Sequence, residues 1–113
     1  MKNENILAVY RFFLFCHFKE SNKLLVNYIY TLQEDIYKSR VEIRNHIIDT
    51  DKDNPINIFY IETRAKDIAT KANEILKICQ IISNNESYVL NKYDNLKERD
   101  KAKKELAIYY KLD

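Results

Sequence analysis

The sequence contains no glycine, no tryptophan, one proline and two cysteines among its 113 residues. Hairpin turns and β-bulges rely on glycine for positive φ angles, so a sheet of many strands is hard to build without it. Glycine-rich phosphate loops and dinucleotide fingerprints are excluded as well, because their glycines let the backbone approach phosphate. The absence of glycine therefore predicts an all-α protein.

A strong excess of charge of one sign is also missing. The chain carries 19 lysines and arginines against 17 aspartates and glutamates, a net charge of +2. This balance demands neither a nucleic acid nor a membrane surface as a partner. Cys16 and Cys79 are far apart and have no C-x-x-C neighbour, so we expect two reduced thiols. We expect no cofactor.

The apolar run over residues 6–18 could be mistaken for a targeting segment. A membrane span needs about 20 apolar residues, and this run is shorter and is interrupted by Arg11 and His17. The residues after it are Lys-Glu-Ser-Asn, which lack the small residues of a signal-peptide cleavage site. We therefore expect a cytoplasmic protein without a membrane partner.

A helix over residues 55–82 is indicated by an apolar seam that steps by three and four residues. Asn54 is the expected cap, and Pro55 suits the first helical position. The predicted seam consists of Ile58, Ile61, Ala65, Ile68, Ala72, Ile75, Cys79 and Ile82. A last helix is expected over residues 85–110, because Ser83 and Glu86 have the spacing of a capping box.

Two further helices are predicted over residues 5–18 and 22–48. The seam of the second consists of Leu25, Ile29, Leu32, Ile36, Ile43 and Ile47, with Ser39 or Arg40 at its polar gap. The junction between them contains neither glycine nor proline and keeps the heptad phase. We favour a break at which Ser21 caps a new helix. The alternative is one helix of about 45 residues, spanning ~65–70 Å, which this chain alone could not cover.

These elements predict a single domain over residues 1–113, an antiparallel bundle of three or four helices. If the first two helices are continuous, we expect the chain to form a dimer, because so long a helix would need a second copy to cover it.

Arg40 and His46 lie six residues apart near the end of the 22–48 helix. This spacing resembles the R-x(4–6)-H signature of the HEPN ribonucleases, and the resemblance implies RNA cleavage by these two residues. Histidine titrates near neutrality and arginine can hold a phosphate. Six residues are about 1.7 helical turns, so the two side chains would point in nearly opposite directions.

The segment Asp49-x-Asp51-x-Asp53 begins like a calcium-binding loop. The twelfth position of such a loop is Tyr60 instead of glutamate, and Pro55 occupies the position that supplies a backbone carbonyl. Neither histidine follows a glutamate at the Glu-x-x-His spacing of di-iron bundles. The sequence therefore predicts no metal site.

Four lysines recur along the last helix and form a basic stripe. They are Lys97, Lys101, Lys104 and Lys111. A basic stripe can follow the phosphates of a nucleic acid, although acidic residues are interleaved within this segment. Nucleic-acid binding, or ribonuclease activity at Arg40 and His46, is therefore the alternative function.

Aromatic residues are abundant, with nine tyrosines and five phenylalanines. Tyrosine is enriched at protein interfaces because it buries a large area and keeps a polar group. The candidate partner-binding residues are Tyr28, Tyr30, Tyr37, Tyr109 and Tyr110. We expect a non-enzymatic protein-binding module, an adaptor or stoichiometric inhibitor, that binds another protein or itself. The composition is typical of small helical proteins from phages and mobile elements.

Overall fold

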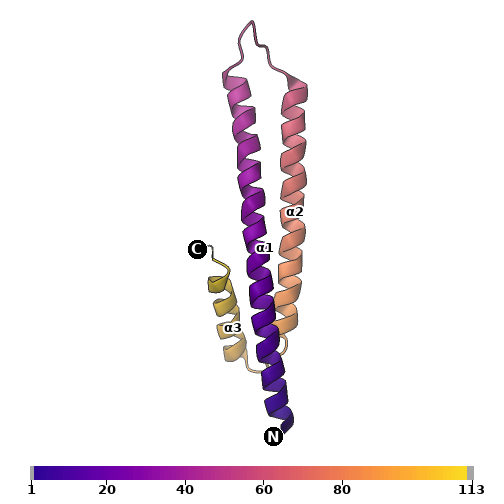
Figure 1. Ribbon diagram of the computed structural model, residues 1–113, viewed down its shortest axis with the longest axis vertical. Helices are drawn as coiled ribbons and strands as arrows, with labels where there is room; N and C mark the ends of the chain where they lie inside the picture. Colours follow the sequence, from indigo (N-terminus) through magenta and orange to yellow (C-terminus); the bar gives the residue numbers. More distant parts are fainter. Residues whose placement is uncertain (1, 112–113) are drawn as a thin grey trace. The chain divides into compact units, whose positions relative to one another are not determined.

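The computed structural model describes residues 2–111, with the side chains of residues 6–111. The described residues form three helices and no strand (Figure 1). The helices are α1 (Lys2–Ile48), α2 (Ile58–Leu90) and α3 (Leu96–Tyr109). The all-α class predicted from the missing glycine is confirmed. We expected three or four helices, and the described residues form three.

Helix α1 runs without interruption through the junction at which we favoured a break. The capping of a new helix at Ser21 is therefore wrong, and the continuous alternative is correct. Asn22 explains why the helix continues. Its side chain is fully buried and bonded to Asn85 and Tyr110, so tertiary contacts hold this turn in a helical conformation.

Helix α2 begins at Ile58, three residues later than predicted. The Asp51 carboxylate accepts hydrogen bonds from the backbone N–H groups of Asp53 and Asn54, both at 2.8 Å. This turn keeps Asn54 and Pro55 in the loop, so the predicted cap and first helical position are wrong. Asn57 replaces them, because its Oδ1 accepts a hydrogen bond from the N–H of Tyr60 at 3.1 Å.

The predicted break near Ser83 is also wrong, since α2 continues to Leu90. The extra turns bury Val89 and Leu90, and this burial outweighs the capping-box signal. The chain turns instead after Leu90, and Asn95 caps α3 by accepting hydrogen bonds from the N–H groups of the residues at positions 97 and 98.

The chain divides into two compact units, which we describe separately. Unit 1 combines Met1–Asn27 with Ile78–Asp113. Its core is a cluster of buried apolar side chains from all three helices: Phe15, Val89, Leu90, Ala102 and Leu106. Within unit 1, α3 lies against α1, to which Tyr110 is hydrogen-bonded through Asn22.

Unit 2, Tyr28–Lys77, is a hairpin of the second part of α1 and the first part of α2, side by side (Figure 1). The α1 seam is nearly as predicted, with Leu32 and Ser39 buried and Ile47 exposed. On α2, the predicted seam residues Ala65 and Ala72 are exposed, as is Cys79 of unit 1. Their places are taken by polar residues that bond to α1. Apolar spacing alone could not reveal this exchange.

Candidate functional site

Three of the five tyrosines predicted to bind a partner are exposed on α1 in unit 2. The exposed fractions are 44% for Tyr28, 50% for Tyr30 and 57% for Tyr37. The Tyr28 hydroxyl donates a hydrogen bond of 2.8 Å to Glu74, and this bond raises the pKa of Tyr28. A hydrogen bond to Glu34 likewise raises the pKa of Tyr30. All three residues are therefore accessible to water on the helix surface.

These three tyrosines do not share one face. Tyr30 and Tyr37 are seven residues apart, so they lie within about 20° of each other around the helix axis. Tyr28 lies about 160° away from Tyr30, on the flank that is bonded to Glu74. We refer to Tyr30 and Tyr37 as the tyrosine surface, to which Tyr28 does not belong.

The other two predicted tyrosines pack within unit 1. The Tyr110 hydroxyl accepts a hydrogen bond of 2.8 Å from Asn22, and burial raises the pKa of Tyr110. Tyr109 donates a hydrogen bond to Glu20, and the ammonium groups of Lys19 and Lys23 lie 4.3 Å and 4.8 Å from the centre of its ring. These contacts hold α3 in place, so both rings are half-buried and serve the fold.

A second exposed surface lies near the start of α1, in unit 1. Six large apolar side chains there are between 50% and 66% exposed. They are Ile6, Leu7, Val9, Tyr10, Phe12 and Phe13, and together they form the N-terminal apolar surface. Our site residues omitted this surface. The signal that could have revealed it is the all-round apolarity of residues 6–18, which exceeds what one buried face requires.

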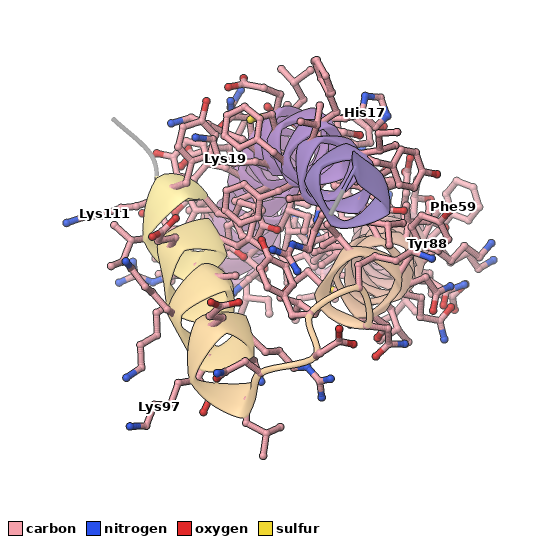
Figure 2. All side chains as sticks on the ribbon, turned by 90° about the horizontal axis from the view of Figure 1, so that it is seen from below. His17, Lys19, Phe59, Tyr88, Lys97 and Lys111 are labelled. Carbon is pink, nitrogen blue, oxygen red and sulfur yellow. The ribbon has the colours of Figure 1, made fainter. Side chains whose placement is uncertain are left out.

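The four lysines of the predicted stripe are all exposed on α3 or just after it. Lys97, Lys101 and Lys104 fall within an arc of about 60° on α3, opposite the buried residues Ala102 and Leu106. Figure 2 shows Lys97 and Lys111 pointing outwards from α3. Exposed carboxylates at positions 98, 100 and 105 flank this arc on both sides. The structure thus gathers the lysines on one face of the helix without isolating them from acidic groups.

Arg40 and His46 are placed in different surroundings. Arg40 is exposed, whereas His46 is half-buried where the hairpin closes. His46 Nε2 accepts a hydrogen bond of 2.9 Å from the N–H of Asn57, and its ring lies 4.8 Å from that of Tyr60. A general base at His46 would have to give up this hydrogen bond before it could accept a proton.

A hollow of about 710 Å³ opens beside His46 and is lined by the loop residues Asn54, Pro55 and Ile56. The Asp51 carboxylate near this loop is engaged by backbone N–H groups, as described above. Nowhere among the described side chains do three histidines, cysteines or carboxylates gather as metal ligands. The two hydrogen bonds to Asp51 thus hold this loop as a turn.

Within residues 2–111, none of the helices combines the length and the apolarity that crossing a membrane requires. Neither a protein-family model, nor a curated protein, nor a solved structure matches this chain. The geometry described above is accordingly what supports the proposals that follow.

Proposed function

We propose that this protein is a small protein-binding module, an adaptor or stoichiometric inhibitor, that binds its partner through the tyrosine surface of α1. The observation that carries the proposal is the exposure of Tyr30 and Tyr37 on the same flank of one helix. Large aromatic side chains left in water on a stable helix are typical of binding surfaces.

The spacing of the two rings suits a helical partner. Residues seven positions apart stand about 10 Å apart along the helix axis, so two rings can anchor two turns of an opposing helix. The half-buried Val41 flanks the rings on the same side of α1. Each hydroxyl keeps a polar group at the edge of the contact, where it can bond to water or to the partner.

The test is co-purification of a partner with the full chain, followed by titration calorimetry with that partner in purified form. We expect the Tyr30→Ala, Tyr37→Ala double variant to bind at least 100-fold more weakly, because central aromatic anchors dominate interface energies. Phe59→Ala is the control, since it removes an exposed aromatic side chain of unit 2 that lies on α2. A partner that binds all three proteins equally would contradict the proposal.

Binding of nucleic acid through α3 is a second candidate, supported by the gathering of three exposed lysines on one face of the helix, with a fourth just after it. Phosphate contacts make affinity fall with salt, with a slope of roughly 0.7–0.9 per contact on logarithmic axes. We expect a Lys101→Glu, Lys104→Glu variant to lose salt-sensitive binding to single-stranded RNA and to duplex DNA. Lys38→Glu, on exposed α1, is the control. If the wild-type protein shows no salt-sensitive binding to either, this candidate is wrong.

A further inference from the structure

The N-terminal apolar surface covers far more of α1 than a single packed face. At 100° per residue, its six side chains span about 220° around the helix axis, whereas a helix packed on one core needs a stripe of about 100°. The remaining arc of these turns carries Ala8, Arg11 and Phe15, which face the rest of unit 1, and Leu14 at the edge of the surface packs against the core cluster. The apolar surface is therefore additional to the part of α1 that packs in unit 1.

The exposed area matches what a specific interface needs. At half to two-thirds exposure, each of the six side chains leaves on the order of 100 Å² accessible, or about 600 Å² in all. Two copies that covered this surface mutually would bury about 1,200 Å², which is the lower limit for stable protein–protein interfaces. A typical monomer exposes apolar patches of about 300–600 Å², so this surface is at the upper end.

The surface is also free of charge. None of its six side chains is ionised at neutral pH. Arg11, the charged residue between them, is turned away, with its guanidinium 4.7 Å from the centre of the Tyr93 ring. Two copies of this surface can therefore meet without like-charge repulsion, whereas a charged partner would find no complementary group on it.

Among the described side chains near this surface, two lysines are engaged by aromatic rings of unit 1. Lys19 lies over Tyr109 and Lys92 lies over Tyr88, at 4.3 Å and 4.5 Å from the ring centres. Interfacial helices that bind lipid carry basic residues along the edge of the apolar face, where they meet anionic headgroups. This arrangement favours a protein surface over a lipid surface as the occupant.

We propose that the N-terminal apolar surface binds the same surface of a second copy, giving a twofold-symmetric dimer. In such an interface each residue meets the symmetry-related surface, so one uncharged patch complements itself. Tyr10 interacts with Tyr88 of α2, and Tyr88 is itself 46% exposed. The edge of the surface thus reaches α2, where the Lys92 ammonium lies 4.5 Å from the centre of the Tyr88 ring. This inference does not depend on the tyrosine surface.

The test is the mass of the untagged full chain by sedimentation equilibrium between 1 and 100 μM. We expect twice the 13.6 kDa of one chain, and we expect Phe13→Asp to weaken the dimer by at least 100-fold, because it places a carboxylate in the apolar centre. Phe59→Asp is the matched control: Phe59 lies in unit 2 and is 76% exposed, compared with 66% for Phe13. We expect Phe59→Asp to remain a dimer over the same concentration range. Val9→Lys provides a second disruptive variant, and circular dichroism verifies that every variant is folded.

Three outcomes would overturn the proposal. The wild-type protein could remain monomeric at 100 μM, or Phe59→Asp could dissociate as readily as Phe13→Asp. A wild-type monomer that binds vesicles of phosphatidylcholine and phosphatidylserine, with binding lost in Phe13→Asp, would identify a lipid surface as the occupant. None of these outcomes bears on Tyr30 and Tyr37, so failure of the dimer is distinguishable from failure of the proposed function.

Discussion

The two units of this chain are stabilised by different interactions. Unit 1 buries a continuous apolar cluster in which Val89 and Leu106 are fully inaccessible. Unit 2 buries only Leu32 and Ser39 among its described residues. Polar contacts join its helices instead. Two of them are hydrogen bonds, from Ser39 to Asp67 and from Tyr28 to Glu74. The others are ion pairs: Glu42 pairs with Arg64, and Lys71 pairs with both Asp35 and Asp67.

The two kinds of interaction have different roles: one stabilises the fold, and the other fixes how the helices are aligned. Apolar burial supplies most of the free energy of folding and has no direction, so the cluster of unit 1 provides cohesion. Partly exposed ion pairs contribute little free energy but require particular partners. We infer that the polar contacts of unit 2 fix which turns of α1 and α2 lie opposite each other. The exposed tyrosine surface is thereby held at a defined position on the hairpin.

The largest effect is expected from a cavity in the core of unit 1. Leu106→Ala should lower the free energy of unfolding by about 3 kcal/mol, because it removes a fully buried side chain that cannot be replaced by its neighbours. Ile108→Ala on the same helix is the control. Ile108 is 74% exposed, and its replacement should cost less than about 0.5 kcal/mol. Urea denaturation measures both changes, and equal losses would show that α3 is not anchored through Leu106.

The next largest effect concerns the buried polar network of unit 1. Asn22 accepts a hydrogen bond of 2.9 Å from Asn85 and donates one of 2.8 Å to Tyr110. Asn22→Ala leaves its two half-buried partners without these hydrogen bonds and should cost about 2 kcal/mol. Tyr110→Phe removes one of the two bonds and should cost about half as much. If Asn22→Ala unfolds at the urea concentration of the wild type, the network does not stabilise unit 1.

Much of this fold could be predicted from sequence, because helix formation follows from local signals. The absence of glycine and the apolar spacing identified the helical segments, and Ser39 was one of the two residues named for the polar gap on α1. The helix ends were harder. Ser21 and Ser83 carry capping signals that tertiary contacts override, since Asn22 and Val89 are buried in turns that sequence alone would have ended.

The candidate site was less predictable, for a physical reason. Whether an aromatic residue binds a partner or fills the core depends on which face of its helix is covered. Tyr37 and Tyr110 have the same side chain, yet one is exposed and the other bonds to buried Asn22. Likewise, the polar interior of unit 2 places Ala65 and Ala72 outside, although their spacing matches a packed seam.

Smaller effects are expected in how the stability of each unit depends on pH, because one carboxylate in each unit has a shifted pKa and the two shifts are opposite in direction. In unit 2, hydrogen bonds from Lys71 and Ser39 lower the pKa of Asp67 below its ordinary value. Ionised Asp67 therefore stabilises the folded state above pH ~4, and this contribution is lost as the pH falls through the lowered pKa. Asp67→Asn should unfold at a lower temperature than the wild type at pH 7, and the difference should shrink below pH 4. A difference that is constant with pH would contradict this prediction.

In unit 1 the sign is reversed, because burial raises the pKa of Glu86 and Lys103 only partly offsets it. The ionised carboxylate disfavours the folded state, and this cost grows as the pH rises from about 4 through the raised pKa. Glu86→Gln should therefore melt at a higher temperature than the wild type at pH 7 and at the same temperature at pH 3. Glu62→Gln, at an exposed position of α2, is the control and should change little at either pH. If Glu86→Gln and Asp67→Asn shift the melting temperature in the same direction at pH 7, an ionised carboxylate has the same effect on stability in both units, and the comparison is wrong. Unit 1 and unit 2 would then differ in which residues they bury, but not in how an ionised carboxylate affects their free energy of unfolding.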